Sequence, residues 1–337
     1  MARKNFIILF CLLLGAAFAT SCVHEFPDPY PNEVTLTLRF DMELPFYKEY
    51  IVDTRATADD SYRQRYILKG YTLYDDGTIA SEPSFTQVWY GPDINNPDCT
   101  VTFQIPAGQW RLAAWSDIVP GSAEQWFYDA SSFAAITYSG TYQGYTDMRD
   151  AWRGTLDFLA EPETFEGRVY NEVIDMTRPL AKYIFVSTDL EEFIKHYVRI
   201  KNANGAHITA DDVDLSQFRV VFFYSGYMPN TYNLLLDRPV DSATGVRFEG
   251  GLTLLEDGTV AMGFDYTMVR TTESSVLVTV GVFDADGTQL SMSPGIEVPL
   301  MRSKYTIVKG RFLVTGSSSG VAINPEFDGE FNIIIAD

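Results

Sequence analysis

Apolar and polar residues alternate with a period of two along much of this 337-residue chain. The clearest case is residues 34–40, where Val34, Leu36, Leu38 and Phe40 alternate with threonine and arginine. Successive side chains of a β-strand point to opposite faces of a sheet, so this pattern predicts a strand with one buried face. Further strands are predicted at 66–74, 78–85, 101–105, 109–115, 154–159, 180–186, 218–224, 233–237, 260–267, 275–283, 295–300, 305–314 and 331–335.

Short polar turns separate several of these stretches. The triplet Asp-Gly-Thr occurs three times, with its glycine at Gly77, Gly258 and Gly287. Glycine after aspartate accepts the positive φ angles of a type I′ turn, so each triplet predicts a β-hairpin. The acidic loop around Gly287 lacks the later glutamate of a calcium loop, which favours a hairpin there too. The Pro-Ala-Gly turn at 106–108 likewise predicts a hairpin between its flanking strands.

One segment has the period of a helix instead. Leu190, Phe193, Ile194 and Tyr197 are spaced by three and four residues, which places them on one helix face. Thr188, with a glutamate three residues later, indicates a capping box at the start of this helix.

Many short strands with turns between them predict an all-β fold. We expect two antiparallel β-sandwich domains, at 34–178 and 179–337, with the one short helix in the second. The length fits this number, since domains commonly have roughly 100–200 residues. Residues 118–146 are rich in glycine, serine, alanine and tyrosine, and they predict a long loop or irregular excursion.

The N-terminus has the features of an export signal. Two basic residues are followed by an apolar run that is too short for a membrane span, and small residues then precede Cys22. This order resembles a bacterial lipobox, in which residues 1–21 are removed and the cysteine is acylated. The alternative is an ordinary signal peptide that ends near a cysteine. Residues 22–33 contain three closely spaced prolines and predict an extended tether.

Composition excludes several kinds of chemistry. The formal net charge is −20, or −22 without residues 1–21, and it opposes binding to the phosphates of nucleic acids. Three cysteines and three histidines are too few for metal clusters or a disulfide framework, so we expect no metal and no cofactor. After acylation of Cys22 the remaining thiol is Cys99, which we expect to be buried and inert. No nucleophile elbow, zinc motif or P-loop occurs, which argues against an enzyme.

Aromatic side chains offer the one alternative chemistry. All five tryptophans lie between residues 89 and 152, and Trp126, Phe127 and Tyr128 are consecutive in the irregular segment. Exposed rings can stack on sugars, so these three are candidate ligand contacts of a surface glycan-binding protein. Burial in the core is the competing interpretation, and exposure of the rings distinguishes the two.

The order of these features resembles a family, the fimbrillin-like fimbrial lipoproteins of Gram-negative gut and oral anaerobes. The resemblance extends over residues 22–337, and no single segment carries it alone. The segments that carry it are Cys22, the first strand at 34–40, the strand-turn-strand at 105–117, and the segments 148–154 and 178–189.

The resemblance implies transthyretin-like β-sandwiches, a lipid anchor in the outer membrane, exposure on the cell surface, and assembly with other fimbrial subunits by β-strand addition. In polymerising members, cleavage after an arginine removes the first strand. Arg55 lies in a suitable polar stretch, although anchor-type members are not processed. The family has no catalytic residues. Its members are structural or adhesive, so a host or glycan ligand is a further expected partner.

The C-terminal segment is the candidate donor strand. Phe331, Ile333 and Ile335 alternate along it, and a glycine-serine stretch at 316–320 lies upstream. Such a strand can reach into a neighbouring subunit, because only one connection restrains it. The alternative, which the sequence favours, is that this segment forms the final core strand of the second domain.

Overall fold

The computed structural model describes residues 33–43, 62–91, 99–121, 126–161, 169–271, 273–314, 320–323 and 330–336. These residues form an all-β fold, as predicted, and the described part contains one α-helix, Leu190–Ala203 (α2). Three single 3-10 turns accompany it, at Asp147–Arg149 (η1), Ala210–Asp212 and Leu215–Gln217. None of the described helices is long and apolar enough to cross a membrane.

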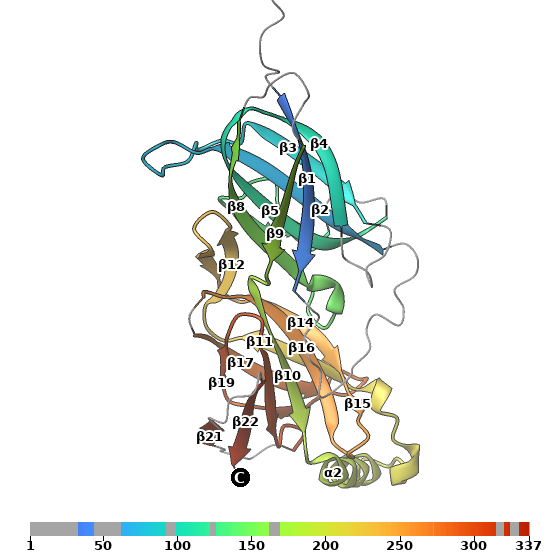
Figure 1. Ribbon diagram of the computed structural model, residues 1–337. Coiled ribbons are helices and arrows are strands. Elements are labelled where there is room, and N and C mark those ends of the chain that lie inside the picture. Colours follow the sequence, from blue (N-terminus) through green and yellow to red (C-terminus); the bar gives the residue numbers. More distant parts are fainter. Residues whose placement is uncertain are drawn as a thin grey trace, which may run out of the picture.

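Two sheets make up the N-terminal part of the molecule (Figure 1). Their orders are β4-β1-β9 and β3-β2-β5-β8. They pack face to face around a shared apolar core, in which the ring of Phe40 lies 5.1 Å from that of Tyr66. The strands are β1 (Glu33–Met42), β2 (Tyr62–Thr72), β3 (Phe85–Tyr90), β4 (Cys99–Pro106), β5 (Gly108–Pro120), β8 (Ala151–Ala160) and β9 (Val169–Met176).

The Pro-Ala-Gly turn does not form the predicted hairpin. β4 pairs with β1 in one sheet, whereas β5 pairs with β2 and β8 in the other, so the chain crosses between sheets here. Gly108 has a φ of 150°, and the indole nitrogen of Trp110 donates a hydrogen bond to the Pro106 carbonyl at 3.0 Å. Proline and glycine therefore mark a change of sheet, and the prediction was wrong because sequence does not specify which strands pair.

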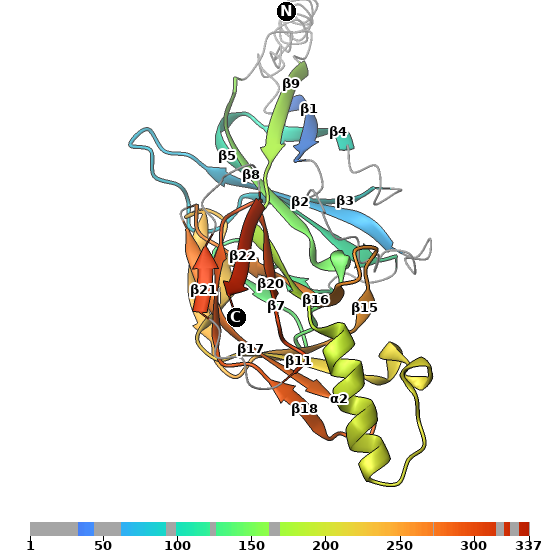
Figure 2. The ribbon, with the colours of Figure 1, turned by 90° about the horizontal axis from the view of Figure 1, so that it is seen from below.

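Two larger sheets lie in the C-terminal part, in the orders β15-β16-β10-β20-β22-β21 and β14-β11-β17-β18, with β19 also pairing with β17. Phe185 on β10 packs on Phe222 of β11 at 5.6 Å between ring centroids, and α2 packs Phe193 against Phe218 at 5.0 Å. Figure 2 shows β20, β22 and β21 as neighbours along one side. The strands are β10 (Leu180–Ser187), β11 (Arg219–Tyr224), β14 (Arg247–Gly251), β15 (Thr253–Leu254), β16 (Val260–Met268), β17 (Ser274–Phe283), β18 (Gln289–Met292), β19 (Ile296–Leu300), β20 (Tyr305–Gly310), β21 (Gly320–Ile323) and β22 (Glu330–Ala336).

A fifth sheet combines strands from both parts of the chain. Its order is β13-β12-β7-β6, from β6 (Tyr128–Asp129), β7 (Ile136–Tyr138), β12 (Met228–Asn233) and β13 (Arg238–Ala243). The segment 118–146 is therefore not only irregular, because two short strands in it pair within a sheet that includes β12. The strand predicted at 233–237 is wrong, since β12 ends at Asn233 and residues 234–237 form a turn in which Asp237 has a positive φ of 55°.

The central strands are buried on both faces. Along β10, Ile184 faces an apolar cluster that includes Trp115 of β5, whereas Phe185 faces the cluster that includes β11 and α2. All nine residues of β16 are likewise buried. Strands that are covered on both faces have nearly continuous apolar sequences, which explains why β10 and β16 do not alternate. One apolar cluster thus contains residues from both sides of residue 178, and the two-domain division there stays a prediction.

The three Asp-Gly-Thr turns are tight, but not of type I′. Gly77, Gly258 and Gly287 each have φ near 80°, whereas the preceding aspartates do not have positive φ. In the first turn Tyr74 N–H donates to the Thr78 carbonyl at 2.8 Å, and the Asp76 carboxylate accepts from the Thr78 amide at 2.9 Å. This is the three-residue hairpin loop that ends in a left-handed glycine.

The helix begins differently from the prediction. Asp189, not Thr188, is its N-cap residue, and no side-chain capping bond forms there. The Asp189 carboxylate instead accepts hydrogen bonds from the Leu313 and Val314 amides, at 3.3 and 3.0 Å. The predicted apolar face is present, with Phe193 and Tyr197 buried.

Candidate functional site

The structure describes some of the sites predicted from the sequence but not others. Cys22 and Arg55 lie outside the described residues. The C-terminal segment that carries Phe331, Ile333 and Ile335 forms β22, which pairs in parallel with β20 of its own chain and antiparallel with β21. This backbone position is that of a final strand of the chain's own sheet.

The aromatic trio is mostly buried. Tyr128 is 1% exposed and its hydroxyl donates to the Arg149 carbonyl at 2.6 Å, while Phe127 is 9% exposed. Trp126 is 37% exposed, and its ring lies against that of Tyr62 at 6.3 Å. Burial removes Phe127 and Tyr128 as ligand contacts, because neither ring can present a face to a sugar. Their role is in the core between the sheets.

β1 occupies a position that a separate strand could fill. It lies between β4, to which it runs antiparallel, and β9, to which it runs parallel, so both of its edges are paired. Its four inward side chains are Val34, Leu36, Leu38 and Phe40, and they are 0–3% exposed. Without β1, two strand edges and an apolar groove would face solvent together, which is the condition for strand addition.

The end of β1 contacts the start of the C-terminal part. The Glu43 amide donates to the Met176 carbonyl at 2.8 Å, and the Glu43 carboxylate accepts from the Arg178 amide at 2.9 Å and the Ser303 hydroxyl at 2.8 Å. The indole of Trp152 donates to the Glu43 carbonyl at 3.2 Å. β1 is thus anchored where β9 passes into β10.

Next to this point lie three buried ion pairs, Arg149–Asp265, Asp147–Lys182 and Asp150–Arg178, which we call the junction ion pairs. Arg149 Nη1 lies 2.6 Å from Asp265 Oδ1, and both side chains are at most 1% exposed. The hydroxyls of Tyr142 and Tyr224 donate to the same carboxylate at 2.5 and 2.6 Å. Burial raises the pKa of Asp265, and Arg149 together with these hydroxyls acts in the opposite direction.

The other two junction ion pairs connect the same short segment to β10 and to Arg178, two residues before β10. Lys182 Nζ lies 2.6 Å from Asp147 Oδ1, which also accepts from the Tyr266 hydroxyl at 2.6 Å. Arg178 donates two hydrogen bonds to the Asp150 carboxylate, at 2.8 and 2.9 Å. All three pairs use residues of η1 or its C-cap and join them to residues at or after position 178. Sequence reasoning missed this cluster.

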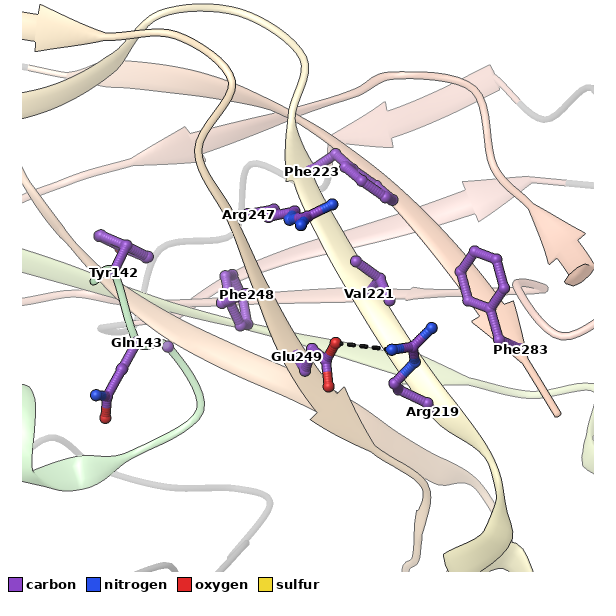
Figure 3. A pocket seen from close by; sticks show the side chains of 10 residues that line it. Tyr142, Gln143, Arg219, Val221, Phe223, Arg247, Phe248, Glu249 and Phe283 are labelled. Atoms are coloured by element: carbon purple, nitrogen blue, oxygen red, sulfur yellow. Dashed lines mark hydrogen bonds and ion pairs between the residues drawn. The ribbon is translucent and has the colours of Figure 1, made fainter. Parts of the chain in front are cut away.

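A surface pocket lies on the outer face of the sheet formed by β14, β11 and β17 (Figure 3). We call it the Arg247 pocket; its volume is about 480 Å³. Arg247 on β14 is opposite Phe223 on β11, and Arg219 on β11 is opposite Phe283 on β17. The sheet's other face carries the buried Phe222 and Phe248, so alternation sends the pocket's side chains outward. The lining residues are Tyr142, Gln143, Gly144, Arg219, Val221, Phe223, Arg247, Phe248, Glu249 and Phe283.

The pocket has a positive lining on an acidic chain. Its charged side chains are two arginines and one glutamate, whereas the whole chain has a net charge of −20. Arg219 Nη1 donates to Glu249 Oε1 at 3.1 Å, and its guanidinium lies 5.5 Å from the ring centre of Phe283. Within the described residues, the side chain of Arg247 is exposed and makes no hydrogen bond or ion pair. A guanidinium in this state is free to bind an anion.

The structure gives no indication of a metal centre in its described parts, where no group of three or more metal-ligating side chains occurs. Cys99 is a free, half-buried thiol whose pKa is raised by burial, so it is less reactive than an ordinary cysteine.

Three comparisons place the chain among known proteins. A family model described as a family of unknown function (DUF6562) matches residues 29–336, and no curated protein matches. Similar solved structures include the fimbrial anchor protein Mfa2 of Porphyromonas gingivalis, with a TM-score of 0.36 and 11% identity over 77% of this chain and 82% of that one.

Two further structures are of the same kind. The tip fimbrial protein Mfa3 of Porphyromonas gingivalis has a TM-score of 0.37 and 10% identity, over 79% of this chain and 81% of that one. A Bacteroides thetaiotaomicron protein proposed to be an adhesin has a TM-score of 0.43 and 12% identity, over 80% and 81%. The predicted resemblance is thus confirmed to the extent that fimbrial proteins are among the similar structures. At these scores the likeness carries no argument about function.

Proposed function

We propose that this chain, which belongs to the DUF6562 family, is a lipid-anchored surface protein of fimbrial type that assembles with other subunits by β-strand addition. In this proposal Cys22 holds the protein to the outer membrane. The first strand, β1, occupies the position that accepts a strand, and Arg55 is the cleavage site in a processed form. The C-terminal strand β22 is the donor. The protein is not an enzyme.

One observation carries the proposal. β1 is paired on both edges and buries all four of its inward side chains, and it precedes the other described strands in the chain. Arg55 lies between β1 and β2, so a single cut there would separate β1 covalently from the rest of the fold. A removable strand over an apolar core is what strand addition requires.

The C-terminal strand has a matching sequence pattern. Phe331, Ile333 and Ile335 alternate with a period of two, as the inward residues of β1 do. β22 lies between β20 and the last strand of its sheet, β21. In this proposal the pairing with β20 describes the free subunit, and transfer of β22 to a neighbour describes the assembled one.

A glycan-binding surface protein is the second candidate. With Phe127 and Tyr128 buried, the aromatic trio supports it only through the partly exposed Trp126. The feature that favours it is the Arg247 pocket, which is distinct from the β1 position.

The lipid anchor is tested by Cys22→Ala. We expect the variant to move from the membrane fraction to the soluble fraction, because acyl chains supply the membrane affinity and the described residues contain no spanning helix. Detergent partitioning of fractionated cells measures this. Cys99→Ala, which changes the other thiol of the mature chain, is the control and should stay in the membrane. Unchanged partitioning of Cys22→Ala would contradict the anchor.

The donor role of β22 is tested by Ile333→Asp, with Asn332→Asp as its control. Each adds one negative charge to the same strand, but the two positions face opposite sides of it. We expect Ile333→Asp to abolish assembly with other subunits and Asn332→Asp to retain it, as measured by electrophoresis of assembled fibres.

Thermal unfolding of the monomer separates the donor role from a purely internal one. An internal core strand predicts that Ile333→Asp lowers the melting temperature strongly, because a charge would enter the core unpaired. A donor strand predicts a small change in melting with loss of assembly. Normal assembly by the stable variant would refute donation by β22.

A further inference from the structure

We propose that the Arg247 pocket is a binding site for an acidic saccharide, specifically a sugar unit that carries a carboxylate, such as a uronic acid. The proposal rests on the juxtaposition of an unpaired guanidinium, a half-buried aromatic ring and a carboxylate acceptor in one cavity. It does not depend on assembly by strand addition, because no lining residue of the pocket belongs to β1 or β22.

The guanidinium of Arg247 supplies the charge recognition. It points from β14 toward β11 and lies between the side chains of Phe223 and Val221 (Figure 3). Arg219 is already bound to Glu249, so Arg247 is the arginine with all its donors available among the described residues of this pocket. Arginine binds a carboxylate with two parallel hydrogen bonds, which makes it selective for a planar anion.

The rest of the lining suits a ring that bears hydroxyl groups. Phe223 is half-buried and offers an apolar surface on which the C–H groups of a pyranose can lie. Glu249 accepts hydrogen bonds from hydroxyls, and the exposed Gln143 amide can both donate and accept. A volume of about 480 Å³ lies within the usual range of small-molecule sites. Donors, acceptors and an apolar surface together match a saccharide better than an inorganic anion.

An acidic peptide is the main competitor, and the backbone argues against its usual mode of binding. An extended peptide would add to the edge of β14, on the side away from β11. The segment 142–144 lies beside β14 in Figure 3 and lines the pocket, so a peptide that approached β14 from that side would meet this segment.

The experiment titrates the purified Cys22→Ala chain with digalacturonic acid, its dimethyl ester and hexaglutamate, and measures binding by calorimetry. The ester has the same shape without the charge, and the peptide has the charge without the sugar ring. We expect the acid to bind, and the ester to bind at least about tenfold more weakly, since a charge-assisted pair is lost. Arg247→Gln should weaken binding of the acid to a similar degree.

Arg238→Gln is the matched control, because Arg238 is an exposed arginine on β13 that does not line the pocket. It should bind the acid as the unmodified protein does, and circular dichroism should show all variants folded. Equal binding of acid and ester would overturn the proposal, as would equal losses in Arg238→Gln and Arg247→Gln. Tighter binding of hexaglutamate would assign the pocket to a peptide. Absence of binding at about 10 mM of the acid would also overturn it, since weaker affinities lie beyond useful recognition.

Discussion

Replacing Asp265 with alanine is expected to lower the free energy of unfolding by about 3–5 kcal/mol, the usual cost of breaking a buried ion pair. Arg149 would remain 1% exposed with no carboxylate beside it, and the hydroxyls of Tyr142 and Tyr224 would lose their shared acceptor. The remaining contacts of Arg149 are the Gln143 carbonyl and the rings of Tyr138 and Tyr142, which cannot neutralise its charge. Urea denaturation followed by circular dichroism measures the change.

Two variants test whether charge is the cause. Asp265→Asn keeps an acceptor for the tyrosine hydroxyls but removes the charge, so its loss should lie between those of alanine and the unmodified protein. Asp41→Ala breaks the Arg39–Asp41 pair, whose side chains are 46% and 49% exposed, and it should cost at most about 1 kcal/mol. A loss below about 1 kcal/mol for Asp265→Ala would mean that the buried pair does not stabilise the fold.

The junction ion pairs join two of the segments on which the family resemblance rests. Arg149 and Asp150 belong to the segment 148–154, and Arg178 and Lys182 belong to the segment 178–189. In the structure Asp150 binds Arg178, and Lys182 binds the neighbouring Asp147. A buried charge needs its partner, so a change in one segment is costly unless the other changes with it. The two segments are thus one structural unit that holds η1 against the six-stranded sheet.

Local pattern was sufficient to predict most strands. The strand predicted at 78–85 was wrong, because only Phe85 of these residues belongs to a strand, β3. β1 was evident because one of its faces is buried and the other is exposed, which produces strict alternation. β10 and β16 were evident for a different reason, as short apolar runs buried on both faces. The error at 233–237 has a local cause, because three leucine residues there lie in a turn after β12 and not in the strand itself.

Pairing was not predictable from local pattern. β4 and β5 are adjacent in sequence, yet they lie in different sheets, and this choice depends on β1, β2, β8 and β9. The junction ion pairs had one signal, a single charged residue inside an apolar strand, at Lys182 in β10 and at Asp265 in β16. Their partners could not be named, because Arg149 and Asp265 are 116 residues apart in the chain.

The Arg247 pocket was missed for a related reason. Arg219 and Glu249 each stand in a strand whose alternate residues are apolar, which indicates only an exposed face. Arg219 and Glu249 lie on one surface because of the antiparallel register of β11 and β14. In this register Val221 is opposite Glu249, and Phe223 is opposite Arg247. The segment 142–144, which closes one side, comes from the part of the chain before residue 178.

Removing β1 is the second large change. A chain that begins at residue 56, as cleavage after Arg55 would leave it, lacks the four inward side chains of β1. Burial of each contributes about 1.5–3 kcal/mol, so the loss is on the order of 6–12 kcal/mol. Whole domains are stable by only about 5–15 kcal/mol, so we expect the N-terminal sheets of the shortened chain to be partly unfolded at room temperature. Hydrogen exchange of the amides in β4 and β9 measures this directly.

A peptide of residues 33–42 should restore protection in β4 and β9 when it is added to the shortened chain, because it supplies the same edges and the same apolar face. The matched control is that peptide with Leu36→Asp and Leu38→Asp, which keeps the backbone donors but cannot enter the apolar groove. A peptide of residues 330–336 tests donation, since its Phe331, Ile333 and Ile335 have the spacing of the inward residues of β1. Protection by the first peptide and the C-terminal peptide, but not by the control, is the result that strand addition predicts.

Full protection of β4 and β9 in the shortened chain without any peptide would contradict this account, because it would mean that the fold does not need a strand between them. If the peptide of residues 33–42 restores protection and the peptide of residues 330–336 does not, the position of β1 is still the one that accepts a strand. The donor strand would then come from a different kind of subunit. The distinction is physical: both peptides offer backbone hydrogen bonds to the same two edges. Stable pairing also requires side chains that fit the apolar groove between Ile105, Leu112 and Ile174.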